Sequence, residues 1–255
     1  MLVPTMTNAE ISAEIFTDFG GMINKLMAIE KEKAKRMIKT KTYDLIFSDE
    51  YKSQRGNKYK YVYHIRGKSR AKMKANVTLY VFHKTEHSTN VIRLVYNVDK
   101  NGMNEGYLYI YSHHFFDRYI ERLKLNTSFG EVVNNYMINN VDNIRPLTFG
   151  EKVEDEMRKH FDNMEKEHGK ELADILRKEN SQMFEHMNKN AKDTPVYLFD
   201  ANGLGCGEKE DDFYIMKTFV SNDMLFNTQK AFGKLNDDVN SQSKREILAE
   251  KNRQK

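Results

Sequence analysis

The spacing of apolar residues changes from helical to extended along the chain, and this change predicts the order of elements. Apolar residues between Ile11 and Ile29 recur every three or four positions, as in an amphipathic helix, and a charged stretch at 30–41 follows. From Tyr43 the period becomes two, in runs at 43–47, 60–66, 76–83, 89–98 and 107–111. The connections are too short for crossover helices, so these runs predict an antiparallel meander.

Helical and extended patterns alternate again in the second half of the chain. Two helices are predicted at 113–125 and 128–140, and two closing strands at 196–199 and 213–220. Between them, residues 151–192 are strongly charged and contain no proline, which predicts one long helix or a helical hairpin with Gly169 as its weak point. We therefore expect an α+β protein, an antiparallel β-meander flanked by helices with a long charged helix or hairpin before the closing strands.

Five segments follow from these changes of pattern. They are an N-terminal helical segment (1–42), an antiparallel sheet with a histidine-bearing helix (43–149), a charged helical insertion (150–193), closing strands of the same domain (194–233) and a polar tail (234–255). The apolar stripe within 151–192 favours packing against a second copy or another protein.

The amino-acid composition says more about the cellular compartment of the protein than about its activity. The 41 basic and 37 acidic residues give a net charge of +4, so the overall charge indicates no particular partner. Cys206 is the single cysteine, which excludes an intramolecular disulfide and fits a reducing compartment. No apolar run approaches the roughly 20 residues that span a bilayer. A cytoplasmic protein that does not bind membranes is the expectation.

The local distribution of charge is far less even than the total. Residues 51–85 contain ten lysines and arginines and no acidic residue. On one extended strand, alternate basic residues would share a face, and nearby tyrosines could stack on bases while the cations bind phosphates. The predicted nucleic-acid face comprises Arg66, Lys68, Arg70, Lys72, Lys74, Tyr61 and Tyr63. A solvated hairpin tip is the alternative, because charge runs commonly form wet surfaces.

The segment that most resembles catalytic machinery is the predicted helix after Ser112. Its apolar residues gather on one arc, and His114, Arg118 and Arg122 form a stripe at four-residue spacing beside that arc. Ser112 is a plausible N-cap, which places His113 and His114 in the first turn, where backbone N–H groups favour an anion. His113 is accordingly a further candidate for nucleic-acid binding.

Histidine and arginine together are suited to RNA cleavage without a metal. The substrate supplies its 2′-hydroxyl as nucleophile, so the protein needs a general base or acid and cationic stabilisation of the transition state. An amphipathic helix with surface ion pairs would give a similar pattern. His113, Asp117 and Glu121 could also present metal ligands, but mixed stripes of this kind are common on solvated helices, and we expect no metal and no cofactor.

The same residues carry a resemblance to a known family. A strand, the Ser112-x-His114 motif, arginines at four-residue spacing and a later strand with Thr or Ser resemble the core of RelE-like and BrnT-like toxin ribonucleases, the metal-independent group of barnase and colicin type. The resemblance implies catalytic roles for His114, Arg118, Arg122, Thr218 and Ser221, with Lys217 binding nucleic acid. Those toxins are smaller, and they lack both the complete meander before the histidine helix and the long insertion after it.

Three functions of different classes therefore remain open. The first is a metal-independent endoribonuclease that binds RNA in preference to DNA. The second is a nucleic-acid-binding protein without catalysis. The third is a non-enzymatic structural or interaction protein of a phage or mobile element that assembles through its long charged helix.

Overall fold

The computed structural model describes most of the chain up to Leu225. The described residues are 1–69, 72–99, 102–144, 146–148, 158–159, 161–163, 165–166, 169–171, 173–175, 177–178, 181 and 195–225. Within them, none of the helices is both long and apolar enough to cross a membrane.

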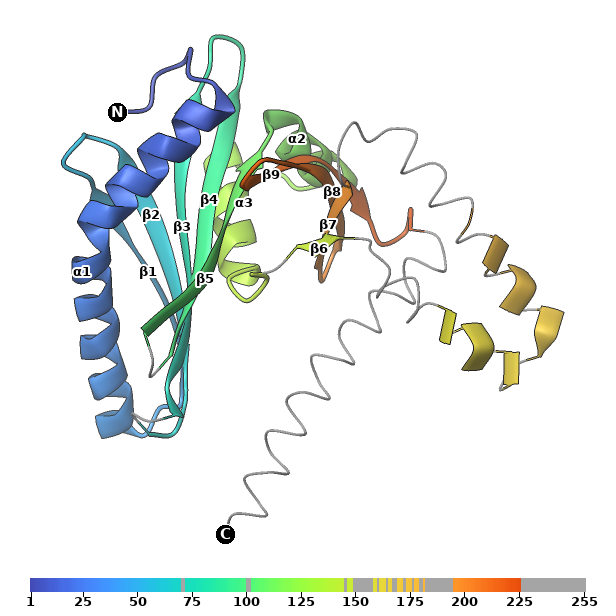
Figure 1. Cartoon of the computed structure of the whole chain (residues 1–255), viewed down its shortest axis with the longest axis horizontal. Coiled ribbons are helices and arrows are strands. Elements are labelled where there is room, and N and C mark those ends of the chain that lie inside the picture. The colour runs from blue at the N-terminus through green and yellow to red at the C-terminus, as the bar shows by residue number, and fades with distance from the viewer. Residues whose placement is uncertain are drawn as a thin grey trace.

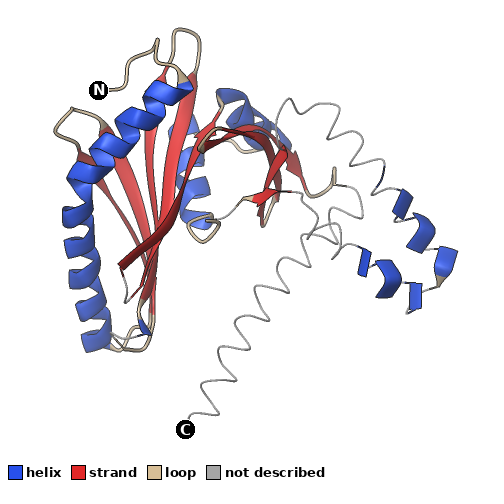
Figure 2. Ribbon diagram, viewed as in Figure 1, coloured by secondary structure: helices blue, strands red, loops and turns tan. Residues whose placement is uncertain are grey.

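Most elements lie where the pattern predicts them, but the strands at 147–148 and 203–210 were not predicted. The helices are α1 (Asn8–Thr40), α2 (His113–Arg122) and α3 (Phe129–Asn139). The strands of the first half are β1 (Asp44–Lys52), β2 (Lys58–Arg66), β3 (Lys74–Lys84), β4 (Thr89–Asp99) and β5 (Gly102–Tyr111). Those of the second half are β6 (Leu147–Thr148), β7 (Pro195–Asp200), β8 (Gly203–Glu210) and β9 (Phe213–Ser221). The α+β class is therefore confirmed (Figure 2).

All the strands belong to one sheet in the order β1-β2-β3-β4-β5-β9-β8-β7-β6. Strands β1 to β5 pair with their sequence neighbours in antiparallel fashion. Strand β9 then pairs with β5 in parallel, through residues 213–216 and 108–111, and so joins the closing strands to the first five. Figure 1 shows α1 along one face of the sheet and α2 and α3 on the other.

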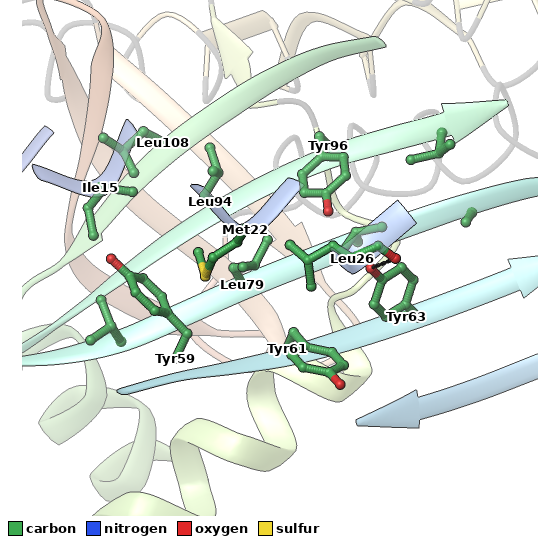
Figure 3. Packing of buried hydrophobic residues seen from close by; sticks show 14 of the residues in the cluster. Ile15, Met22, Leu26, Tyr59, Tyr61, Tyr63, Leu79, Leu94, Tyr96 and Leu108 are labelled. Atoms are coloured by element: carbon green, nitrogen blue, oxygen red, sulfur yellow. Dashed lines mark hydrogen bonds between the residues drawn. The ribbon is translucent and has the colours of Figure 1, made fainter. Parts of the chain in front are cut away.

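The strand pleat divides the core into two layers, because successive side chains point to opposite faces. Beneath α1, Tyr59, Tyr61 and Tyr63 pack with Leu26 and its neighbours (Figure 3). Beneath α2 and α3, a second cluster contains Tyr111, Phe115, Phe116, Tyr136 and Phe219. Aromatic side chains thus fill both layers of a protein that has no tryptophan.

Buried polar contacts hold α1 in register on β2. The helix begins with a capping box formed by Thr7 and Glu10. Asp18 is buried and accepts hydrogen bonds from the Tyr59 hydroxyl (2.8 Å) and from the Asn57 side-chain amide (2.7 Å). Further along, the Tyr63 hydroxyl donates to the carbonyl oxygen of Leu26. These bonds set both the rotation and the position of α1 along the sheet.

The glycine-rich segment 203–207 forms the first half of β8, where the pattern predicts no strand. A Cβ atom at Gly203 or Gly207 would lie 2.1 Å from a carbonyl oxygen of β9, so these glycines allow close approach of two backbones rather than a turn. The alternating pattern was absent because glycine contributes no side chain to either face.

The charged region 151–192 lies mostly outside the described residues. Its described stretches are helical, and Gly169 has a φ of +90°. The Arg177 guanidinium contacts the Asp162 carboxylate at 3.0 Å and the Glu165 carboxylate at 2.8 Å. In one straight helix, Asp162 and Arg177 would be about 22 Å apart along the axis. The chain therefore reverses near Gly169.

Candidate active site

The start of α2 is fixed to β9 by its capping residue. The Ser112 hydroxyl accepts a hydrogen bond from the Phe115 N–H at 3.2 Å and donates to the Lys217 carbonyl oxygen at 3.1 Å. The Ser112 N–H donates to the Met216 carbonyl oxygen at 3.0 Å. β9 pairs with β5 only as far as Met216. The residues of β9 that follow Met216 lie beside α2 instead. The predicted N-cap is thus confirmed, and it also joins two distant segments.

His114 and Arg118 lie together on the outer side of α2. The Arg118 Nε–H donates to His114 Nε2 at 3.4 Å, so the ring nitrogen that faces the guanidinium carries no proton in this arrangement. His114 is exposed and Arg118 is half-buried. Arg118 also forms an ion pair with Glu121, with Nη1 and Oε2 2.6 Å apart. Once this long contact with Arg118 opens, the single lone pair of the His114 ring nitrogen is free, and the imidazole can act as a general base next to a bound phosphate.

Arg122 extends the stripe by one further turn and is less exposed than its position on the helix suggests. Its Nη1 atom is buried and has no hydrogen-bond partner within the described part of the chain. Arg122 also lies near the Cys206 thiol of β8: burial raises the pKa of that thiol to about 12, and the nearby guanidinium partly offsets this rise. Buried donors normally have an acceptor, so this nitrogen lacks, among the described residues, the partner that a buried guanidinium usually has.

The predicted residues of β9 differ in their access to this region. Thr218 is half-buried and pairs across the strands with Cys206, the residue near Arg122. Lys217 occupies the irregularity between β8 and β9, is half exposed and forms an ion pair with Glu208. Ser221 is only 3% exposed and lies at the far end of the strand. Burial therefore argues against the predicted catalytic role of Ser221.

His113 has a packing role in this structure. Its Nδ1 donates to the Thr89 carbonyl oxygen at 3.2 Å, and its ring lies against Phe129 with centroids 4.9 Å apart. Its Nε2 lies 3.4 Å from an Asp117 carboxylate oxygen. His113 thus connects α2 to β4 and α3, and its side chain is 39% exposed. The described residues contain no group of three or more His, Cys, Asp or Glu side chains placed to hold a metal ion.

The basic segment does not form the single strand that the alternation predicts. β2 ends at Arg66 and β3 begins at Lys74, and these two residues lie directly opposite each other. Gly67 has a φ of +141°, and a Cβ there would lie 2.5 Å from the Lys72 carbonyl oxygen, so the chain turns sharply at this point. Lys68 and Lys72 are exposed in this turn, whereas Arg70 lies outside the described residues.

Tyr61 and Tyr63 cannot stack on bases in this structure. They are 3% and 1% exposed and are covered by α1 (Figure 3). The sequence correctly places them on one face of the strand, but that face is the one that packs on the N-terminal helix. This correction removes both tyrosines from the predicted interface.

A cluster around His64 was not predicted. Its two ring nitrogens lie 2.6 Å from an Asp44 oxygen and 2.9 Å from an Asp142 oxygen. Asp142 also accepts two hydrogen bonds from the Arg66 guanidinium, each 3.2 Å long, and one from Asn76. No sequence signal links Asp142 to residues more than 60 positions earlier. Its carboxylate neutralises Arg66, which weakens the predicted role of Arg66 in nucleic-acid binding.

The basic turn and α2 lie at opposite ends of the sheet. Lys74 begins β3, whereas Lys84 at its other end pairs with Thr89, the residue whose carbonyl oxygen contacts His113. Ten residues of strand correspond to about 33 Å. The two predicted regions therefore do not form one continuous site.

No protein-family model matches this chain, and no curated protein or solved structure shows significant similarity to it.

Proposed function

We propose that the protein binds nucleic acid and cleaves RNA without a metal, with the active site on the outer side of α2 where it runs beside β9. The observation that carries this proposal is the buried Nη1 of Arg122, which has no partner among the described residues and lies on the same helix stripe as Arg118 and the exposed His114. An RNA phosphodiester that binds the accessible parts of the Arg118 and Arg122 side chains would bring an acceptor next to this nitrogen. Arginine suits this contact because its planar guanidinium can donate two hydrogen bonds to a phosphate.

In the proposed reaction, the phosphate takes over the hydrogen bond of the Arg118 Nε–H, and the freed lone pair of His114 Nε2 takes the proton of the 2′-hydroxyl. The 2′-oxygen then bonds to phosphorus, and the bond from phosphorus to the 5′-oxygen of the next nucleotide breaks. The departing oxygen takes a proton from water, which leaves a 2′,3′-cyclic phosphate and a 5′-hydroxyl. Arg118 and Arg122 stabilise the charge on the phosphoryl oxygens, while Lys217 and Thr218 contact the flanking backbone.

The test is incubation of the purified protein with labelled single-stranded RNA and DNA in EDTA, with His114→Ala beside the wild type. We expect RNA to be cleaved and DNA left intact, since DNA lacks the 2′-hydroxyl, and we expect the variant to lose about 100-fold or more in rate. His87→Ala is the matched control, because His87 is also a surface histidine, with a side chain that is 92% exposed.

Equal rates of RNA cleavage by the wild type and by His114→Ala would refute the catalytic role of His114. RNA that stays intact with both proteins would refute the ribonuclease activity. Binding without cleavage would leave a nucleic-acid-binding protein.

A second candidate function is assembly through region 151–192. The observation in its favour is Ile175, an apolar side chain that is 51% exposed in this charged region. The test is light scattering of the wild type and of Ile175→Lys. A mass that rises with protein concentration and is lost in the variant would support assembly, and a monomeric mass for both would refute it.

A further inference from the structure

The end of the sheet that lies opposite to α2 carries a surface drawn from two distant segments. We define this end surface by seven basic residues. They are Lys35, Arg36, Lys39 and Lys41, from the C-terminal end of α1, and Lys68, Lys72 and Lys74, from the turn between β2 and β3. All seven are exposed.

Backbone contacts hold the two segments side by side. Lys41 ends α1 in the left-handed conformation, with a φ of 55°, and turns the chain into β1. Two residues later, the Tyr43 carbonyl oxygen accepts a hydrogen bond of 3.0 Å from the Gly67 N–H. Met37 of α1 and Met73 of the turn are buried in the same apolar cluster. Figure 1 shows the end of α1 beside the turn that links β2 and β3.

None of the seven side chains of the end surface has an ion pair among the described residues. The carboxylates of Asp44 and Asp142 contact His64 and Arg66. Asp99, which ends β4 beside the start of β3, also has a contact of its own. Glu32 is the exposed acidic residue on this part of α1. Like charges gathered without counter-charges are favourable when an anionic polymer contacts them.

Tyr43 indicates which anionic polymer fits. Its side chain is 43% exposed, and its backbone forms the contact between α1 and the turn. An accessible aromatic ring among lysines is the arrangement that single-stranded nucleic acid uses, with a base on the ring and phosphates on the cations. Tyr43 thus offers the accessible ring that the sequence pattern assigned to the buried Tyr61 and Tyr63.

We propose that the end surface binds single-stranded nucleic acid, with Tyr43 stacking on a base and the seven cations contacting phosphates. The inference deepens the proposed function by adding a second contact region about 33 Å from α2. It shares with that proposal the class of ligand but uses no residue of α2 or β9. A substrate long enough to reach both regions would therefore bind more tightly than a short one.

The first test measures binding of a fluorescein-labelled uridine oligonucleotide by anisotropy over about 50 to 200 mM salt. The end-surface variant carries Lys39→Gln, Lys41→Gln, Lys68→Gln and Lys72→Gln. The control carries Lys52→Gln, Lys58→Gln, Lys84→Gln and Lys209→Gln, four exposed lysines away from the end surface, so that both variants lose the same formal charge.

We expect the end-surface variant to bind at least about tenfold more weakly and its salt dependence to flatten by about 2 to 3 in log–log slope, near 0.7 for each lost contact. The control should change affinity less than about twofold. Equal losses in both variants would overturn the proposal, since they would indicate diffuse attraction. If the end-surface variant binds RNA as tightly as the wild type but no longer binds phosphatidylserine vesicles, the proposal is overturned, and the ligand of the end surface is an anionic membrane.

Tyr43 separates stacking from charge. Tyr43→Ala should weaken binding about 5- to 150-fold, the usual range for one stacked base, and Tyr43→Phe should retain the affinity of the wild type. Equal affinities for all three proteins would exclude stacking at this position.

The two proposals fail separately. His114→Ala should retain full binding at the end surface, so loss of the ribonuclease hypothesis would leave this inference intact. Conversely, suppose that RNA cleavage depends on His114 and that the end-surface variant cleaves RNA and binds the oligonucleotide as well as the wild type does. This result would overturn only the proposed binding at the end surface.

Discussion

The two ends of the sheet are both basic, but they use their charges differently. At the end surface, seven exposed cations have no acidic partner among the described residues. At the α2 end, Arg118 pairs with Glu121, Lys217 pairs with Glu208, and Arg122 has a buried nitrogen. Exposed, unpaired charges attract a polymer at long range, whereas a few positioned donors recognise one phosphate. The comparison teaches that the number of exposed charges, which is high at the end surface, and the precise position of a few donors, which marks the α2 end, are separate properties.

The largest expected effect concerns Arg122. We predict that Arg122→Ala lowers the rate of RNA cleavage about 100- to 1000-fold, the usual cost of removing one positioned donor, and leaves oligonucleotide affinity at the end surface unchanged. Single-turnover cleavage and anisotropy on the same preparations measure both quantities. Arg36→Ala is the matched control, since it removes an arginine from the end surface. If Arg36→Ala slowed cleavage as much as Arg122→Ala, the distinction between the two ends would be wrong.

A second prediction concerns the attachment of α1, which carries half of the end surface. Asp18→Ala leaves the buried Tyr59 hydroxyl without its acceptor and removes one acceptor from Asn57. We expect a loss of about 2 to 3 kcal/mol in the free energy of unfolding.

Urea denaturation measures the loss, and hydrogen exchange should show faster opening of α1 than of α2. Asp174→Ala, which removes an exposed partner of Arg177, should change stability by less than about 1 kcal/mol. Equal stabilities of Asp18→Ala and wild type would show that this buried contact is dispensable.

The α2 end should also be the pH-sensitive one. Burial raises the pKa of Asp200 to about 6, although backbone N–H groups of Asn202 and Gly203 donate to its carboxylate. Because the pKa of Asp200 is higher in the folded protein than in the unfolded one, protonation of Asp200 stabilises the fold. This stabilisation is complete below about pH 4 and is lost as the pH rises through 6.

Asp200→Asn stays neutral and retains the accepting oxygen. We predict that this variant is more stable than the wild type by about 2 to 3 kcal/mol at pH 8, and that the difference disappears near pH 4. Urea denaturation at several pH values measures it. A difference that is constant across this range would exclude titration of Asp200 as its cause.

The smallest effect is expected at Cys206. Burial holds the pKa of this thiol near 12, so little thiolate is present at neutral pH despite the nearby Arg122. Iodoacetamide should label native protein much more slowly than protein unfolded in urea. Rapid labelling of the native protein would show that β8 opens and that the surroundings of Arg122 are more accessible in solution than in this structure.

Local patterns predicted most of the elements but not their neighbours. The amphipathic spacing and Ser112 located α2, and the period of two located the first five strands within a few residues. β8 was missed because glycines leave no alternation to detect. The predicted run of alternating basic residues was divided by a turn, since Gly67 could adopt a backbone conformation that an alternating pattern does not reveal.

The candidate sites show the same limit. His114, Arg118 and Arg122 share a stripe because four-residue spacing on a helix places side chains on one side. That Tyr61 and Tyr63 share a face was equally predictable, yet only packing shows that α1 covers that face. Tyr43 and Asp142 carried no local signal, because their contacts join residues far apart in the chain.

The sequence by itself determined the helices, most of the strands, the α+β class and the stripe of histidine and arginine on α2, because these depend on the spacing of side chains within a few residues. The tertiary structure alone decided that the basic turn lies about 33 Å from that stripe and that α1 supplies the turn with further basic residues. It alone decided that a buried nitrogen of Arg122 has no partner among the described residues. The physical reason is that burial and charge pairing depend on which distant segments meet, and sheet register and helix packing decide this.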